Sequence, residues 1–353
     1  SSPDCGPEFV YQFGDLSVDK FRLVSRTAST RPSTRRSRFL AVAGANLVSF
    51  DETSSATVLA TNLAPTRSAI FAETVFGETF IADGKALRRV KLGANTADLL
   101  QAKKGAGPDP TSALIALWDG RLVVARGDND PHNFEMSAQG DVYDWDEFPT
   151  DASDARAVSG NSATQDGRMP GVINAIIPIN DQIIVFGCEG SIHRYVGNPA
   201  GDGQRHVVSH DLGIAFGKAW CRDPRGTVYF MADRGGIYVM GSQADSVPFG
   251  GPEAFTVGSL HDEMQQIDFS LYRVHMEWSD ESRGMHVFLI PLDPLDLVVQ
   301  PIHYFFEVAV GEIVIEPPKR SIDEVLDAIE TAREGYAEDE LTEAVERANE
   351  TLG

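Results

Sequence analysis

The sequence repeats one short pattern six times: an apolar run rich in β-branched and aromatic residues, a turn containing Gly, and a second such run. The clearest copies are Gln182–Gly197 and Thr227–Gly241. Gly in the turn supplies the positive φ that a tight reversal requires, so each copy predicts a β-hairpin. A chain of recurring hairpins is restricted to a repeat architecture, in which each unit buries its faces against its neighbours.

The copies begin at residues 39, 79, 121, 182, 227 and 284, at intervals of 40, 42, 61, 45 and 57 residues. A four-stranded propeller blade takes about 40–50 residues. The two long intervals contain insertions, at 144–171 and 242–272, and weaker strands such as Ala113–Trp118 and Val172–Ile177 complete the blades. Helical periodicity is absent between residues 38 and 317. We therefore predict an all-β fold, a β-propeller of six or seven blades, in preference to a sandwich.

Three segments are expected. Residues 1–37 form an N-terminal strand and a basic linker, residues 38–317 the propeller, and residues 318–353 an acidic helical tail. The tail begins with the capping box Ser321-Ile322-Asp323-Glu324 and continues with apolar residues at helical spacing. It either docks to a partner or remains a solvated appendage, since two short helices are marginal without packing.

The segment Arg26–Arg38 contains five Arg and no acidic residue. It is either a basic arm that touches DNA or an acidic neighbour, or a solvated Ser/Thr/Pro linker. Its composition favours the linker, because such a segment cannot pack a core.

The charge limits the partners. The sequence has 52 acidic and 30 basic residues, a net charge of −22 and a pI near 4.7. Such a surface repels nucleic acid and anionic membranes and favours association with basic protein surfaces. No run of eighteen apolar residues occurs, so we expect no transmembrane helix.

Residues that could carry chemistry are scattered. His193, His206 and His210 fall close together but match no metal-ligand spacing, so a structural role is favoured over a metal site. Cys188 and Cys221 lie among apolar or aromatic neighbours, which predicts buried thiols.

The acidic residues of the third interval raise a second possibility, oxygen ligands for Ca²⁺. The twelve-residue Ca²⁺-loop pattern is missing, which favours loop turns instead. The residues concerned are Asp128, Asp130, Asp141, Asp144 and Asp146.

No nucleophile elbow and no phosphate-binding loop is present. The four Trp residues, Trp118, Trp145, Trp220 and Trp278, are expected to anchor blades. We predict no catalytic, cofactor-binding or metal-binding residue, no cofactor, and a protein that is not an enzyme.

One stretch carries a more specific pattern. Asp130-Pro131-His132-Asn133, Ser137, and Gly140-Asp141-Val142-Tyr143-Asp144-Trp145 together read D-P-x-N-x-x-x-S-x-x-G-D-x-x-D-W. Further short matches follow it in order: Ile183–Gly187, Ser191-Ile192, Gly197-Asn198-Pro199, Ser209, Gly213–Ala215 and Gly226–Phe230. This succession resembles the propeller proteins of the tail of tailed bacteriophages, similar to the tail nozzle or tail tubular protein B group. The resemblance covers about residues 110–245.

The resemblance implies a structural protein of the virion, made in the host bacterial cytoplasm and located in the tail. Its partners would be copies of itself in a homo-oligomeric ring, other tail or head–tail connector proteins, and genomic DNA that passes during ejection without sequence-specific binding. An acidic lumen would let DNA slide. The C-terminus departs from the family, because Val308–Ile315 and the helical tail replace a strand rich in Asp, Thr and Trp.

Two alternatives belong to other classes. One is a carbohydrate-active propeller, either a glycosidase or a carbohydrate-binding module; two carboxylates facing each other about 5–9 Å apart in a pocket at the propeller axis would support the enzyme. The other is a generic protein-interaction propeller of a host cell.

Overall fold

The computed structural model describes residues 22–28, 37–43, 45–51, 56–64, 70–73, 77–91, 93–151, 153–163, 167–241, 252–256, 258–292 and 299–308. Within these residues the structure consists of strands β1 to β26 and one helix, α1 (Gly258–Gln265). The strands form six four-stranded sheets and one two-stranded pair.

The sheets follow one another along the chain. The first contains β1 (Arg22–Ala28), β2 (Ser37–Ala43), β3 (Asn46–Asp51) and β4 (Thr57–Ala60). The second contains β5 (Ile70–Glu73), β6 (Glu78–Ala82), β7 (Arg88–Lys91) and β8 (Asp98–Leu99). The third contains β10 (Leu114–Trp118), β11 (Arg121–Ala125), β12 (Phe134–Met136) and β14 (Val158–Ser159).

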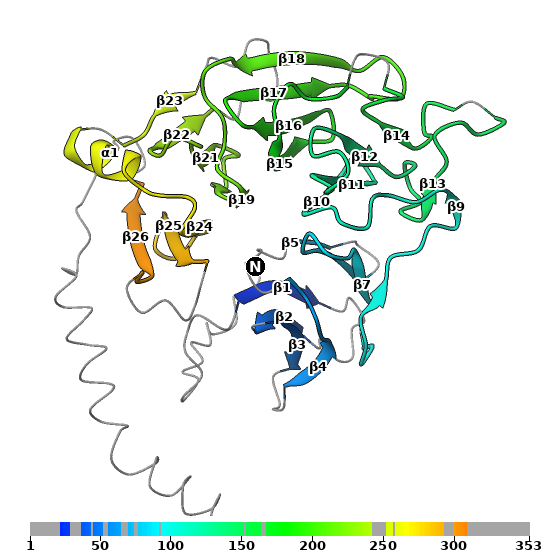
Figure 1. Cartoon of the computed structure of the whole chain (residues 1–353), viewed down its shortest axis with the longest axis horizontal. Coiled ribbons are helices and arrows are strands. Elements are labelled where there is room, and N and C mark those ends of the chain that lie inside the picture. The colour runs from blue at the N-terminus through cyan, green and yellow to red at the C-terminus, as the bar shows by residue number, and fades with distance from the viewer. Residues whose placement is uncertain are drawn as a thin grey trace, which may run out of the picture. The chain divides into compact units, whose positions relative to one another are not determined.

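The fourth sheet contains β15 (Ile173–Asn180), β16 (Ile183–Cys188), β17 (Ser191–Val196) and β18 (Gln204–Ser209), which lie side by side in Figure 1. The fifth contains β20 (Trp220–Arg222), β21 (Val228–Met231), β22 (Ile237–Met240) and β23 (Glu253–Ala254). The sixth has the order β19 (Gly217–Lys218), β24 (Tyr272–Ser279), β25 (Gly284–Pro291) and β26 (Ile302–Glu307). The two-stranded pair joins β9 (Lys104–Gly105) to β13 (Asp144–Trp145) in parallel.

Six such sheets are the arrangement of a six-bladed β-propeller, and the prediction of that fold is confirmed. Each predicted hairpin lies in its own sheet, from β2–β3 to β25–β26. The first strands of neighbouring sheets pack together, β1 on β5, β5 on β10 and β10 on β15, as Figure 1 lets the reader follow. The turn between β10 and β11 has positive φ at both central residues, 46° at Asp119 and 69° at Gly120, as a two-residue hairpin requires.

Two sequence-based expectations need correction. No helix was expected between residues 38 and 317, yet α1 lies in the insertion 242–272; it is eight residues long and buries only Met264, too little to leave a periodic pattern. β1 precedes the expected propeller boundary at residue 38 but pairs with β2, so the first sheet begins earlier. The helical tail 318–353 and residues 1–21 of the N-terminal segment lie outside the described residues.

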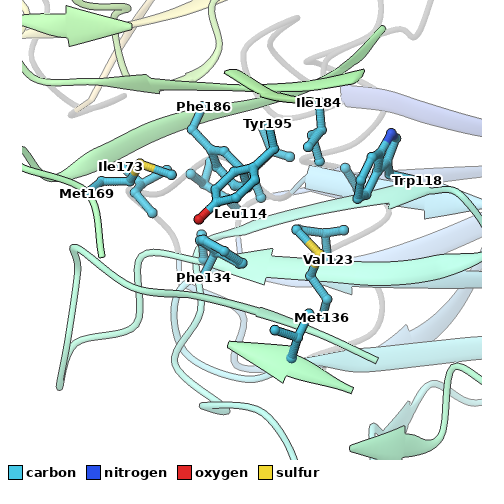
Figure 2. Packing of buried hydrophobic residues seen from close by; sticks show 14 of the residues in the cluster. Leu114, Trp118, Val123, Phe134, Met136, Met169, Ile173, Ile184, Phe186 and Tyr195 are labelled. Carbon is cyan, nitrogen blue, oxygen red and sulfur yellow. The ribbon is translucent and has the colours of Figure 1, made fainter. Parts of the chain in front are cut away.

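A core of buried hydrophobic residues lies between the third and fourth sheets (Figure 2). Phe134 of β12 stacks on Phe186 of β16, with ring centroids 4.9 Å apart, and meets Tyr195 of β17 edge-on at 5.7 Å. Trp118 is buried beside them and donates its Nε1–H to the carbonyl of Asn180 at 2.7 Å. This apolar contact fixes the third sheet against the fourth.

A partly buried carboxylate links the fifth sheet to turns that flank the fourth. Asp233, which follows β21, accepts the backbone N–H of Gly190 at 2.6 Å and that of Gly213 at 3.2 Å. Asp83, which follows β6, likewise accepts the N–H of Ala64 at 2.9 Å. In both sheets, a carboxylate just beyond the second strand thus accepts backbone N–H groups of neighbouring segments.

The chain divides into two compact units, residues 1–278 with 287–303, and residues 279–286 with 304–353. Within the second unit Val308 donates its N–H to the carbonyl of Arg283 at 3.0 Å, and the rings of His286 and Phe305 lie 4.8 Å apart. The third and fourth sheets belong to the first unit. The described part of the chain contains no helix that could cross a membrane.

Candidate functional site

The D-P-x-N to D-W run includes β12 of the third sheet and the loops on either side of it, and its polar residues form hydrogen bonds or ion pairs with neighbouring segments. Asp130 forms an ion pair with Arg168 at 2.7 Å, and its carbonyl accepts the N–H of Asn133 at 3.1 Å. The buried Ser137 accepts the N–H of Leu122 through its Oγ at 2.9 Å. Gly140, at φ +81°, donates its N–H to the carbonyl of Gly120 at 2.9 Å. Each of these contacts fixes the backbone of a loop.

The second half of the run opens the segment Asp141–Asp154, called the acidic loop from here on. Three of its carboxylates accept the backbone N–H two residues ahead: Asp141 from Tyr143 at 3.0 Å, Asp144 from Asp146 at 3.1 Å, and Asp146 from Phe148 at 3.1 Å. Such turns hold a loop in one conformation. Their presence matches the turn role that the sequence predicted for these Asp residues.

Arg121, the first residue of β11, is fully buried and joins three loops. Its Nη1 donates to the carbonyls of Ser137 at 2.9 Å and Arg156 at 2.6 Å. Its Nη2 donates to the carbonyl of Asp154 at 2.8 Å and to Oδ1 of Asn198 at 3.2 Å. Burial lowers the pKa of Arg121, because leaving water penalises the charged form. Asn198 belongs to the later Gly197-Asn198-Pro199 motif. The Arg121 guanidinium therefore connects this motif to Ser137 of the D-P-x-N to D-W run.

The acidic loop is also anchored to the second sheet through Tyr143. The Tyr143 hydroxyl accepts a hydrogen bond from Nη1 of Arg89 and donates one to Oε2 of Glu78, both at 2.8 Å. Nζ of Lys103 lies 4.4 Å from the centroid of the Tyr143 ring. Burial raises the pKa of Tyr143 further above the neutral range, so its hydroxyl is protonated at pH 7.

One pair of carboxyl groups has opposite electrostatic character. Burial raises the pKa of Glu135, in the middle of β12, to about 7. Burial also acts to raise the pKa of Asp109, but hydrogen bonds from Thr111 and Asn129 hold it below its usual value. The contact between these residues is the backbone N–H of Asp109, which donates to Oε2 of Glu135 at 2.7 Å. A raised pKa at one carboxyl group and a lowered pKa at the other can support acid–base chemistry.

The predicted roles of the remaining residues can now be compared with their positions. His193 is buried, with Nε2 3.0 Å from Oγ of Ser191, and burial lowers its pKa to about 4. His206 is part of β18, and His210 follows that strand. Within the described ranges no group of His, Cys, Asp and Glu is arranged to hold a metal ion.

The thiols and the Trp residues divide as follows. Cys188 and Cys221 are free and buried, and burial raises the pKa of each thiol to about 12. Trp118 and Trp145 are core residues, as predicted. Trp220 is only partly buried and lies 3.5 Å beneath Nζ of Lys218, and Trp278 stacks on Tyr229 at 5.9 Å.

Sequence reasoning missed three residues of this region: Arg121, Glu135 and Phe148. A signal existed for the first two, because each is a charged residue inside or beside a run of β-forming residues, where burial forces a hydrogen-bonded role. Phe148 is 81% exposed. Sequence alone does not distinguish it from a core aromatic residue.

The sequence matches no protein-family model and no curated protein sequence. Solved structures match the fold. The extracellular domain of a one-component system from B. thetaiotaomicron is 12% identical with a TM-score of 0.43; the match covers 78% of this chain and 34% of that one. This chain therefore spans about a third of that protein.

Two further structures are similar over most of both chains. A catalytically inactive virginiamycin B lyase from Staphylococcus aureus with quinupristin is 9% identical, with a TM-score of 0.47 and 88% of each chain covered. The calcium-binding protein regucalcin from Agrobacterium tumefaciens is 11% identical, with a TM-score of 0.44 and 86% and 93% covered. At these identities and TM-scores none of the three structures bears on the function of this chain. A proposal for that function must therefore be based on the residues of the chain itself.

Proposed function

We propose that this chain is a structural virion protein of a tailed bacteriophage, a tail nozzle subunit that assembles with copies of itself around the DNA channel. The observation that carries the proposal is the use made of the D-P-x-N to D-W run. Asp141, Asp144 and Asp146 each hold a backbone N–H of their own loop, and Ser137 holds that of Leu122.

This use supports a scaffold because it turns polar residues into determinants of loop shape. A structural subunit needs loops of fixed conformation to meet its neighbours, and each loop that is already ordered loses less entropy on assembly. Arg121 adds to the same effect, since its four hydrogen bonds reach the carbonyls and the amide of three loops.

The net charge supports the channel role. A charge of −22 repels duplex DNA, so DNA could pass such a subunit during ejection without binding it. Other tail or head–tail connector proteins would be the neighbours, and basic surfaces on them would fit this charge.

Negative-stain microscopy of the purified full chain tests the proposal. A ring or tube with a central channel is the expected result, and light scattering should give a mass of several chains. A monodisperse monomer at every concentration would contradict it. A second test is cryo-EM of the assembled particle, which must place the chain at the channel.

A carbohydrate-active propeller is the second candidate, favoured by one observation, the separated pKa values of Glu135 and Asp109. Glycosidases use one protonated and one ionised carboxyl group. Release of reducing sugar from an oligosaccharide panel by the wild type, lost in Glu135→Gln, would establish this function. The function would be rejected if the wild type released reducing sugar no faster than the Glu135→Gln variant and a protein-free blank.

A further inference from the structure

Phe148 is the most exposed large apolar side chain among the described residues. It is 81% exposed, whereas the next two, Leu99 and Val58, are 55% and 52% exposed. It lies in the connection between β13 and β14, within the insertion that lengthens the third interval. An aromatic residue left in water here gives the fold no burial of its own.

The backbone leading into Phe148 is held by hydrogen bonds. Phe148 donates its N–H to Oδ1 of Asp146 at 3.1 Å. Glu147 accepts hydrogen bonds at its carbonyl from Nη1 of Arg156 at 3.1 Å and at Oε2 from Oγ of Ser159 at 2.9 Å. The carbonyl of Arg156 in turn binds the buried Arg121. The ring is therefore presented from a loop connected to the core, and little backbone entropy remains to be lost on binding.

The charges that the acidic loop itself carries have one sign, and Arg156 and Lys104 contact the loop from outside it. The acidic loop contains six carboxylates and no Lys or Arg: Asp141, Asp144, Asp146, Glu147, Asp151 and Asp154. Asp144 is paired with Lys104 at 2.7 Å, and Asp151 and Asp154 are exposed. An apolar ring rimmed by negative charge complements an apolar pocket rimmed by Lys and Arg. The same charge disfavours nucleic acid and an anionic membrane as occupants.

We infer that Phe148 and the acidic loop form a docking surface for a partner protein that presents an apolar pocket bordered by basic residues. Phe148 fills the pocket, and the carboxylates set orientation and association rate. The inference does not depend on the proposed function, because it requires a basic protein partner and not a phage tail.

Photo-crosslinking identifies the partner. The full chain carrying p-benzoyl-phenylalanine at position 148 is produced in the cells that naturally make this protein. A matched control carries the same amino acid at position 99, because Leu99 is exposed on β8 outside the acidic loop. The expected result is one crosslinked species, specific to position 148. The attached peptide of the partner contains apolar residues next to Lys or Arg. Crosslinks to a second copy of this chain, equal yields from the two positions, or none from position 148 would overturn the inference.

The second measurement is the dissociation constant between the uncrosslinked chain and the purified partner that crosslinking has identified. Phe148→Ser should weaken the dissociation constant by about tenfold or more, and Leu99→Ser should leave it unchanged. Asp146→Asn with Glu147→Gln keeps every hydrogen-bond acceptor of the loop but removes two charges, so binding should become less sensitive to salt. Unchanged affinity of Phe148→Ser, with an unchanged circular dichroism spectrum, would contradict the docking role.

Discussion

At the scale of single residues, buried polar groups in and beside the third sheet hold the backbone of neighbouring segments. Arg121 donates to the carbonyls of loops, and Ser137 accepts the N–H of Leu122. A buried polar group is stable only when its hydrogen bonds are made, so each such residue specifies one arrangement of the chain around it.

Arg121→Met should destabilise the protein by about 3 kcal/mol, because three carbonyls and one amide oxygen lose their donor inside the protein. Urea unfolding measures the loss. Arg222→Met is the control: Arg222 also donates to two carbonyls, but from an exposed position, and its loss should cost no more than about 0.5 kcal/mol. Equal losses would show that Arg121 is not a specific support.

Glu135 predicts a pH dependence. Its pKa is about 7 in the folded chain against an ordinary 4.5, so the folded state binds the proton more tightly than the unfolded state. Its contribution to stability is therefore complete below pH 4.5 and falls as the pH rises to 7, by up to about 3 kcal/mol.

Glu135→Gln, which still accepts the N–H of Asp109, should gain stability over the wild type as the pH rises from about 5 to 8. Unfolding free energies at both pH values provide the measurement. A difference between Glu135→Gln and the wild type that stays constant with pH would mean that the pKa of Glu135 is not raised.

Sequence reasoning at this scale succeeded where the chemistry is local. The turn roles of Asp141, Asp144 and Asp146 depend on residues two positions ahead, and the structure confirms them. The position of Arg121 beside a run of β-forming residues indicates a hydrogen-bonded role, but only the fold brings its partners Arg156 and Asn198 near, so no local pattern could reveal them.

At the scale of elements, hairpins were the most predictable feature, because strand, turn and strand are contiguous and the turn chemistry is explicit at Asp119-Gly120. The parallel pair β9–β13 was not predicted, since its strands are two residues long and far apart in sequence. α1 was missed for a similar reason, because eight residues with one buried side chain carry no helical period.

The β9–β13 pair predicts the effect of a single methyl group. Gly105 has φ +73°, and a Cβ there would lie 2.2 Å from the carbonyl oxygen of Trp145. Gly93 has φ +82° with nothing within 4 Å of its Cβ position. Gly93→Ala should cost about 1 kcal/mol from backbone strain alone, and Gly105→Ala at least about 2 kcal/mol more. Calorimetric midpoints compare the two; similar midpoints would mean that the approach of β9 to β13 is looser than described.

At the scale of the whole molecule, charge is the dominant property. The sequence predicted it directly, whereas the identity of any partner depends on surfaces formed by distant segments. With a charge of −22, the folded chain carries repulsion that salt screens. Raising NaCl from about 10 mM to about 300 mM should raise the melting midpoint and promote self-association. A midpoint that stays constant or falls, followed by calorimetry and light scattering together, would contradict this view.

The short strand β19 has a consequence for synthesis. Lys218 pairs with His275 of β24, although the whole fifth sheet lies between them in the sequence. On the ribosome, Gly217 and Lys218 emerge long before their partner strand, and the fifth sheet must form while that edge is still bare. Pairing of β19 with β24 therefore closes a chain loop that contains the whole fifth sheet. The rate of this pairing should limit the folding of the sixth sheet.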